Sequence, residues 1–317
     1  MRLILNLAVA GLVLVTLSTF AAKLSWIFDL LSHFRLQYVV AATFLFAVAL
    51  AVRAYPATMV FAAIAVLHGW TIKSLWLDES VAAAMDGRQL RVLSANVLRS
   101  NPAPERVSSF VHASNADIVV LVEADRARWR QTLVSIGERY PYRAPEGWRD
   151  GAPILLFSRY PIVHTAVVKP PTRQRPYFMA EIEMGTRSLT FVGVHPASPS
   201  LTNNGRDSRR RNRTLDHIAS KIESMDTPVV VAGDFNTTPF SPHFAALIEA
   251  AGLRNAAAGH GWIGTWPQCF WPARIPIDHI LIKGPLIATQ FERGPAIGSD
   301  HFPVLAELRI TALDVAK

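Results

Sequence analysis

The sequence predicts an α/β domain that follows an apolar helical region. From residue 89 to residue 311, short apolar and β-branched runs alternate with helix-length segments. Before residue 77, three longer runs are apolar on every face, which is typical of membrane-spanning helices. We therefore divide the chain into a transmembrane region (1–77), a polar linker (78–88), a catalytic domain (89–311) and a short tail (312–317).

The three apolar runs cover residues 3–22, 36–53 and 57–76, and each is about as long as a bilayer crossing requires. Two alternatives stay open: the first run is a cleaved signal peptide, or all three are core helices of a soluble protein. The basic residues that flank the runs are split between both sides, so they set the orientation weakly. If the N-terminus starts in the cytoplasm, three spans place the domain outside, and cleavage of the first span leaves the domain there as well. This predicts a multi-pass protein of the cell membrane with an extracytoplasmic domain.

Elements of the domain follow from the period of their apolar residues and from the residues that bound them. Helices are expected at Pro102–Ser114, Arg126–Glu138, Arg206–Ser224 and Pro242–Ala251. Strands are expected at Leu90–Val97, Ile118–Val122, Ile154–Phe157, Val163–Val168, Phe178–Glu183, Ser188–Val194, Val229–Ala232, Ile277–Ile282, Leu286–Phe291 and Pro303–Ile310.

Composition narrows the class of partner without choosing one. Lys and Arg number 32 against 24 acidic residues, a net charge of +8, which favours nucleic acid, phospholipid or phosphate esters. Cys269 is the single cysteine, so a disulfide within the chain and a cysteine-based zinc cluster are excluded. Nothing in the sequence calls for an obligate protein partner.

The run that follows the strand Val229–Ala232 is the strongest candidate for a site. Gly233 ends the strand, and Asp234 and Asn236 follow in a loop that Pro239 keeps irregular. A rigid strand that delivers a carboxylate and an amide into a loop is a common way to build a polar site. An Asx turn that only closes the strand is the alternative.

Polar side chains also end the other predicted strands. Because strand ends at one edge of a sheet can meet, we expect these residues to share a site. The set is Asn96, Glu123, His195, Asp234, Asn236, Asp278, Asp300 and His301.

Their chemistry suits phosphoester hydrolysis with a metal. Glu123 and Asp300 are hard oxygen ligands for Mg²⁺ or Mn²⁺, and Asn96 either completes the metal shell or binds phosphate. Asp234 is the candidate base for an attacking water.

Imidazoles complete the set. His195 and His301 are candidate donors to a phosphate that gains charge, and a carboxylate such as Asp278 fixes the tautomer of one imidazole.

Seven motifs in order resemble the endonuclease/exonuclease/phosphatase superfamily, which has the DNase I-like fold. The resemblance covers about residues 88–310 and implies a four-layer αββα sandwich of two mixed sheets. In chain order, the first residues of the seven motifs are Ser94-Ala95-Asn96, Val120-Leu121-Val122-Glu123, Ile154-Leu155-Leu156-Phe157-Ser158, Gly193-Val194-His195-Pro196, Gly233-Asp234-Phe235-Asn236, Pro276-Ile277-Asp278-His279 and Gly298-Ser299-Asp300-His301.

The resemblance also implies a role for each site residue. Glu123 binds the metal with help from Asn96 and Asp300, while Asp234 activates water and Asn236 orients the water or the phosphate. The scissile phosphate is contacted by His195 and His301, with Asp278 supporting His301. His279 is interpreted as a strand residue.

Helical spans ahead of such a domain resemble a bacterial membrane subgroup that includes a teicoplanin-resistance protein. That resemblance implies a membrane-anchored phosphohydrolase, with a lipid-linked pyrophosphate as substrate and the lipid bilayer as a partner. The alternatives are a membrane-tethered nuclease that cuts DNA or RNA, and a membrane protein that keeps the fold only for binding.

Two further stretches are ambiguous. The arginines between Arg206 and Arg213 suit a nucleic acid, an anionic membrane surface, a pyrophosphate or solvent, and Arg211 is the candidate phosphate contact. The aromatic stretch Trp262–Trp271 is interpreted as a packed loop, with membrane contact as the alternative.

Overall fold

The structure is a computed structural model that describes residues 2–77, 88–125, 128–145, 154–171, 174–185 and 187–310. Of the predicted linker only Arg88 lies inside these ranges, and the predicted tail lies outside them.

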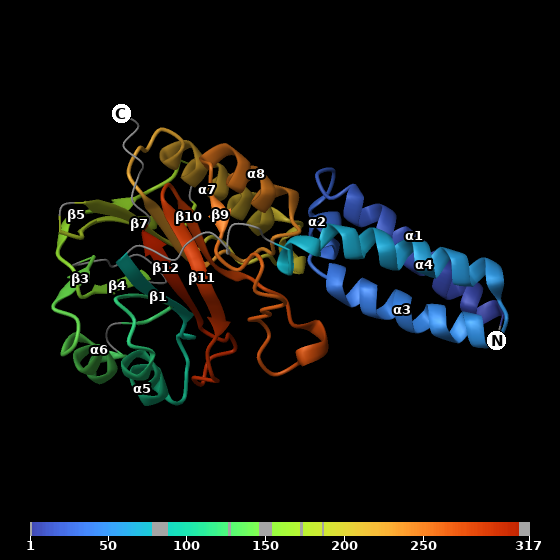
Figure 1. Cartoon of the computed structure of the whole chain (residues 1–317), viewed down its shortest axis with the longest axis horizontal. Helices are drawn as coiled ribbons and strands as arrows, with labels where there is room; N and C mark the ends of the chain where they lie inside the picture. Colours follow the sequence, from blue (N-terminus) through green and yellow to red (C-terminus); the bar gives the residue numbers. More distant parts are fainter. Residues whose placement is uncertain are drawn as a thin grey trace.

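Four helices form the N-terminal region. They are α1 (Arg2–Phe20), α2 (Trp26–Ser32), α3 (Arg35–Ala51) and α4 (Tyr55–Thr71), and a 3₁₀ turn, η1 (Lys73–Leu75), follows. Helices α1, α3 and α4 lie side by side as a bundle that projects from one end of the sandwich, while α2 lies between the bundle and the domain (Figure 1).

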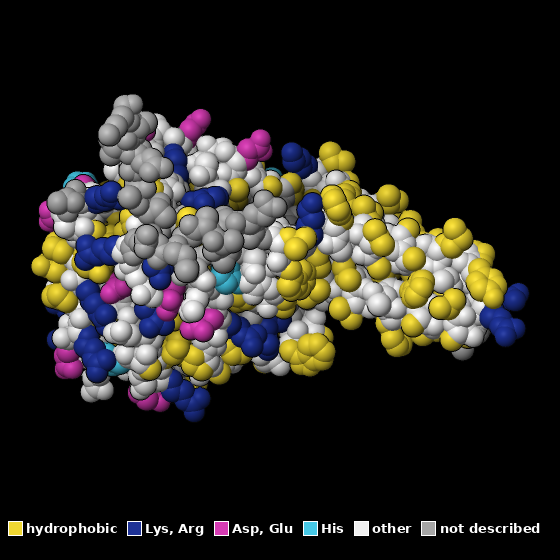
Figure 2. All heavy atoms as spheres, viewed as in Figure 1, with side chains coloured by type: hydrophobic (Ala, Val, Ile, Leu, Met, Phe, Trp, Pro, Cys, Tyr) yellow, Lys and Arg dark blue, Asp and Glu magenta, His cyan; other side chains and the backbone are white. Residues whose placement is uncertain are grey.

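The bundle is apolar on its outer surface and polar in parts of its interior. Figure 2 shows hydrophobic side chains over the projecting helices. Large apolar residues are more than 60% exposed, among them Leu3, Leu7, Leu14, Phe44, Met59 and Val66. Buried inside are Arg35 and His68, with Thr16 within 3.2 Å of the His68 ring. This is the reverse of the pattern in a water-exposed helix.

Helix length and hydropathy indicate which single helices are able to span a bilayer. Among the described residues, α1 alone has both the length and the apolar composition. The pair α2 and α3 meets the same test together but bends by 64°. Because α4 has 17 residues, it falls just short. The multi-pass arrangement expected from the sequence therefore stays a prediction.

The described part of the domain forms two six-stranded sheets. The first has the order β11-β12-β1-β2-β4-β3. Its strands are β1 (Arg88–Asn96), β2 (Ile118–Val122), β3 (Tyr142–Ala144), β4 (Ile154–Ser158), β11 (Leu286–Arg293) and β12 (Val304–Ile310). The second has the order β5-β6-β7-β8-β10-β9. Its strands are β5 (Ile162–Val168), β6 (Tyr177–Glu183), β7 (Ser188–Val194), β8 (Val229–Asp234), β9 (Arg254–Asn255) and β10 (Asp278–Lys283).

Helices cover the outer face of each sheet (Figure 1). The first sheet packs against α5 (Pro104–Ser114) and α6 (Arg130–Gly137) through residues such as Val107, Val111 and Ile136. The second sheet packs against α7 (Arg206–Ile222) and α8 (Pro242–Ala251) through residues such as Leu215 and Leu247. The inner faces of both sheets meet in the main core. The predicted αββα sandwich of two mixed sheets is confirmed.

The topology explains why the polar strand ends meet. Each sheet has a parallel pair at its centre, β1 with β2 and β7 with β8. Parallel strands end at the same edge, so the residues that follow them lie together. The neighbours β12 and β10 run antiparallel to β1 and β8, and they therefore begin at that same edge.

Several close contacts hold the helical region on the domain. Gln37 Nε2 donates to the Arg274 carbonyl oxygen at 2.9 Å. The Gly259 N–H donates to the Ser74 carbonyl oxygen at 3.1 Å. The ring of Trp26 lies against Gly205, where a Cβ would come within 2.2 Å of it. At this position only glycine fits, and its φ of +69° also favours glycine.

Candidate active site

The turn after β8 brings the ends of two strands into contact. Gly233 has a φ of +147°, and a Cβ there would lie 2.0 Å from the Val194 carbonyl oxygen of β7. Only glycine permits this approach. The close packing at Gly233 places Asp234 of β8 beside His195, which follows β7.

Asp234 is buried and lies at the centre of the cluster. Its Oδ1 accepts the Asn236 N–H at 2.8 Å, and its Oδ2 accepts Asn96 Nδ2 at 3.1 Å. Burial raises the pKa of Asp234 to about 7, although the nearby His301 acts in the opposite direction. A carboxylate that takes up a proton near neutral pH is suited to general-base catalysis.

His301 is fixed by Asp278. Its Nδ1 donates to Asp278 Oδ2 at 2.8 Å, and its Nε2 lies 3.8 Å from Asp234 Oδ2. The register of β10 explains this, because Asp278 is the direct antiparallel partner of Asp234. Burial alone would lower the pKa of His301, but the carboxylates of Asp278 and Asp234 raise it to about 10. The imidazolium is therefore the stable form at neutral pH.

The second imidazole has the opposite charge state. Burial, with Arg175 and His301 nearby, holds the pKa of His195 well below its usual value, so the ring is neutral. His195 Nε2 lies 3.5 Å from Glu123 Oε1 and 3.6 Å from Asp234 Oδ2. Arg175 Nη1 lies 3.1 Å from the same nitrogen.

Oxygen-bearing side chains line the same space. Glu123 follows β2 with a φ of +67°, an uncommon conformation for a residue with a Cβ, and its Oε2 accepts the Arg99 N–H at 3.3 Å. Asp300 Oδ2 accepts Trp266 Nε1 at 3.1 Å. Asn96 turns its amide nitrogen to Glu123, at 3.4 Å, and its oxygen to the Leu98 N–H.

Two sets of donors are candidates for a cation among the described residues. The carboxylates of Glu123 and Asp300 are oxygen ligands of the kind that Mg²⁺ prefers. The alternative group is Asp234, Asp278 and His301, whose ligand atoms lie within 4.8 Å of one another. Because His301 Nδ1 already donates to Asp278, this group is occupied by its own hydrogen bonds. The metal site expected at Glu123 and Asp300 stays a prediction.

The cluster forms the floor of a cavity of about 540 Å³ that lies between the domain and the helical region. The apolar part of its wall includes Leu30, Leu31 and Phe34 from α2 and the turn after it. The domain contributes further apolar residues, which are Leu98, Pro199, Leu201, Trp266, Ile275 and Ile277. The lining of the cavity thus combines the polar cluster of the domain with apolar residues from both the domain and the helical region.

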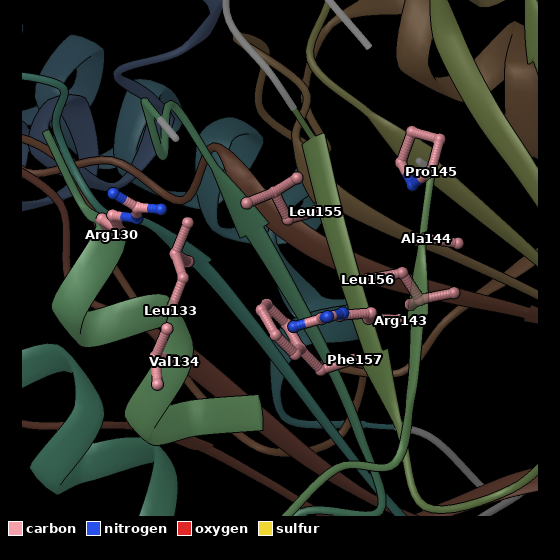
Figure 3. A pocket seen from close by; sticks show the side chains of 9 residues that line it. All are labelled: Arg130, Leu133, Val134, Arg143, Ala144, Pro145, Leu155, Leu156 and Phe157. Carbon is pink, nitrogen blue, oxygen red and sulfur yellow. The ribbon is translucent and has the colours of Figure 1, made fainter. Parts of the chain in front are cut away.

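A second cavity, of about 440 Å³, lies between α6 and strands β3 and β4 (Figure 3). Its lining combines Arg130 and Arg143 with apolar residues such as Leu133, Leu155 and Phe157. Because no carboxylate or imidazole is among its lining residues, it lacks the groups that hydrolysis needs.

Comparison with known proteins identifies the domain. Residues 93–301, about two thirds of the 317-residue chain, match the Endonuclease/Exonuclease/phosphatase family. The chain belongs to this family. It is therefore a hydrolase that acts on phosphoester bonds, and the family depends on a divalent metal. No curated protein matches the chain.

Solved structures share the fold of this endonuclease/exonuclease/phosphatase domain. A humanized TDP2 of D. rerio with 14 mutations has a TM-score of 0.58 at 20% identity, over 70% of this chain and 99% of its own. Sphingomyelinase C from Streptomyces griseocarneus has a TM-score of 0.53 at 20% identity, over 69% and 99%. The family protein from Bacteroides vulgatus has a TM-score of 0.58 at 18% identity, over 71% and 100%.

The structure brings together most of the residues singled out in the sequence. Contacts within the family domain link all but one of them into one cluster, namely Asn96, Glu123, His195, Asp234, Asn236, Asp278, Asp300 and His301. His279 is a buried strand residue whose Nε2 lies 2.9 Å from the Thr237 carbonyl oxygen.

Arg211 is the exception. It is fully buried behind Asn236 and is not among the residues that line the cavity, so the structure does not place it at a phosphate. Its spacing from Leu215, Ile218 and Ile222 puts it on the apolar face of α7, a signal of burial in the sequence. Arg175 is the arginine on the cavity wall, and its loop gave no comparable signal.

Proposed function

We propose that this chain hydrolyses a phosphoester or pyrophosphate bond in an amphiphilic substrate at a membrane. The observation that carries the proposal is the composition of the cavity. Its lining combines Asp234, His195 and His301 of the domain with Leu30, Leu31 and Phe34 of the helical region. A pocket with both kinds of lining suits a phosphate joined to an apolar chain, such as a lipid-linked pyrophosphate.

The outer surface of the bundle supports a membrane location. No Asp, Glu, Lys or Arg occurs within residues 3–22, 36–52 or 54–72. At about 1.5 Å per residue, α1 is roughly 28 Å long, close to the hydrocarbon thickness of about 30 Å. Large apolar side chains exposed on this bundle would be unfavourable in water, and a bilayer would bury them.

Exposed aromatic residues lie where an interface would be. Trp70 lies in the last turn of α4 and is 68% exposed, and Trp76 directly follows η1 and is 51% exposed. Phe270 and Trp271 are also exposed, in the loop whose Arg274 carbonyl oxygen accepts from Gln37 of α3. Tryptophan is typical of the boundary between lipid and water. The mouth of the cavity would then lie near the bilayer surface.

Each side chain of the site has its own role in the proposed reaction. Asp234 accepts the proton of the attacking water, and Asn236 holds the Asp234 carboxylate in line through its N–H. The charged His301 and the neutral His195 donate hydrogen bonds to phosphoryl oxygens as negative charge develops. Arg175 binds the phosphate from the cavity wall, since a guanidinium matches phosphate oxygens well.

Glu123 and Asp300 would hold a divalent cation, and Asn96 remains the predicted third ligand. When bound, such a cation stabilises charge on the leaving oxygen. We propose Mg²⁺, with Mn²⁺ as the alternative. A beta toxin of Staphylococcus aureus that shares the fold was solved with magnesium ions.

We also propose that α1, α3 and α4 each cross the membrane. Their alternating directions put the end of α1 that carries Arg2 and the catalytic domain on opposite sides (Figure 1). An N-terminus in the cytoplasm then places the domain outside. Cys269 is exposed and is the single cysteine, so a membrane-impermeant maleimide should label it in intact cells. Labelling only after lysis would contradict this orientation.

Variants of the apolar wall test the substrate class. We expect Phe34→Ser to raise KM for a long-chain polyprenyl pyrophosphate by about tenfold, with KM for inorganic pyrophosphate unchanged. Losing an apolar contact of about 1.5 kcal/mol gives roughly that factor. The matched control is Phe44→Ser, an exposed residue of the bundle away from the cavity. An equal rise in KM for both substrates would contradict the proposal that the apolar wall binds the chain of the substrate.

Nucleic acid is the competing substrate. A TDP2 of D. rerio that shares the fold was solved with a single-strand DNA product. The helical region forms one wall of the present cavity and limits its extent on that side. This wall favours a substrate that enters end-on over one that lies across the cavity.

A further inference from the structure

A buried ion pair joins the helical region to the domain behind the active site. Arg211 of α7 is fully buried, and its Nη2 donates to Oδ2 of Asp29 in α2. Asp29 is 1% exposed and is the only charged residue between Lys23 and Arg35. Because a buried charge is strongly unfavourable without a partner, each of these two side chains fixes the other.

The same guanidinium reaches the loop that carries Asp234. Arg211 Nη1 donates to the Asn236 carbonyl oxygen at 3.0 Å. Asn236 has a φ of +52°, a conformation that surrounding contacts must hold in place. From there, its N–H donates to Asp234 Oδ1 at 2.8 Å and its Nδ2 to Asp234 Oδ2 at 3.3 Å. A continuous chain of contacts thus runs from Asp29 to Asp234.

Two more contacts tie this loop to the helical region. Ser241 Oγ donates to Asp29 Oδ1 at 2.6 Å. His33 Nδ1 lies 2.9 Å from Thr238 Oγ1, and both groups are buried. Residues on both sides of Pro239 are therefore fixed by α2 and the turn after it. This number of buried polar contacts exceeds what anchoring requires, since a flexible linker would tether the domain equally well.

We propose that Asp29 is a positioning residue for phosphoester hydrolysis. By holding Arg211 against the Asn236 carbonyl, Asp29 makes the alignment of Asn236 and Asp234 depend on the docked helical region. The inference rests on the proposed role of Asp234 as the base. It gives the helical region a part in catalysis that is separate from membrane attachment and from the apolar wall.

Two variants, one single and one double, separate the positioning role from an effect on stability. Arg211→Lys keeps a cation for Asp29, but an ammonium cannot reproduce the two-pronged contact with Asp29 and Asn236. Asp29→Leu with Arg211→Met removes both charges together, which is often neutral for stability when the volume is kept. The control is Asp207→Asn on the same helix, which removes a half-buried ion pair of 3.1 Å with Arg210.

The assay uses the full-length protein in detergent with bis(p-nitrophenyl) phosphate, a small diester that does not need the apolar wall. We expect both Arg211→Lys and the double variant to keep the wild-type melting temperature and KM. In both, kcat should fall by about tenfold or more, since a small misplacement of a catalytic group costs up to about 100-fold. Asp207→Asn should keep the wild-type kcat.

Wild-type kcat in a folded Arg211→Lys variant or in a folded double variant would overturn the proposal. If the double variant does not fold, Arg211→Lys alone decides the question by its kcat. Asp234→Asn is measured first in the same assay. If it keeps the wild-type rate, the proposed function fails. If it is inactive while the Arg211 variants are fully active, only the positioning role fails.

Discussion

The Nδ1 atom of His301 lies 2.8 Å from Oδ2 of Asp278, and both side chains are buried. Asp278 and the nearby Asp234 raise the pKa of His301 to about 10 even though burial alone would lower it. The pair therefore keeps a positive charge in the site at neutral pH, where a phosphoryl group would gain negative charge.

Replacing Asp278 by Asn should remove much of that charge. The pKa of His301 should fall, so that the alkaline limb of the profile of kcat/KM against pH moves down from about 10. At pH 8 we expect kcat to fall by about 100-fold, the lower range for loss of a general acid or base. The control is Asp216→Asn, an exposed carboxylate on α7. An unmoved alkaline limb would contradict the role of Asp278.

The stability of the folded protein should depend on the same pair, Asp278 and His301. A group whose pKa is raised on folding stabilises the protein fully below its unfolded pKa, which is about 6.5 for histidine. That contribution is lost as the pH rises through the folded value of about 10. We therefore expect the melting temperature of the wild type to exceed that of Asp278→Asn at pH 6, with a gap that shrinks towards pH 10. Thermal unfolding followed by circular dichroism measures this gap.

The ionisation of Asp234 should set the acid limb of the profile of kcat/KM against pH. Because burial raises its pKa to about 7, the ionised base is lost as the pH falls below that value, and kcat/KM should fall with it. Asp234→Asn has the same shape without a carboxylate, and we expect a loss of at least about 100-fold in kcat. The folded state should persist, since removing a buried charge relieves a desolvation cost. A variant with the wild-type rate would exclude Asp234 as the base.

Removing the metal should abolish turnover. We expect EDTA to stop hydrolysis and Mg²⁺ to restore it, with Mn²⁺ as an effective substitute. Glu123→Gln removes a charged ligand and should weaken Mg²⁺ binding by at least about tenfold in calorimetry. The control is Glu138→Gln, at the end of α6, a residue that is not among those lining the cavity. Unchanged Mg²⁺ affinity in Glu123→Gln would move the cation to another site.

The contact between Trp26 and Gly205 predicts a difference between two glycines. Gly205→Ala and Gly252→Ala both place a Cβ at positive φ, which costs about 1 kcal/mol each. Gly205→Ala would also press on Trp26, whereas the nearest atom to a Cβ at Gly252 is Lys283 Cε at 3.8 Å. We therefore expect the larger loss of unfolding free energy in Gly205→Ala. Equal losses in chemical denaturation would mean that α2 is loosely docked.

Much of this domain could be predicted from the sequence because its signals are local. The run Val229–Ala232 reads as a buried strand, and the structure extends it to Asp234. Helix Pro242–Ala251 begins and ends at the predicted residues. Once the superfamily is known, polar residues at strand ends are expected to converge, because the parallel pairs at the centre of each sheet end at one edge.

The parts that were missed depend on contacts between distant residues. Helix α2 has seven residues, too few for a clear period, and strands β3 and β9 have three and two. Asp29 and Arg211 are 182 positions apart, and no local pattern connects them. Two signals were present all the same: an isolated acid in an apolar stretch, and an arginine on the apolar face of a helix. Each of these features predicts that the residue is buried with a partner, but neither identifies the partner.

One assay tests most directly whether the site hydrolyses an amphiphilic phosphoester. Full-length protein in detergent with Mg²⁺ is given a polyprenyl pyrophosphate, and plasmid DNA in parallel. An Asp234→Asn/His301→Ala variant serves as the inactive control. We predict phosphate release from the lipid that the variant lacks, without nicking of the plasmid. Nicking without phosphate release would contradict the claim and make the chain a membrane-tethered nuclease.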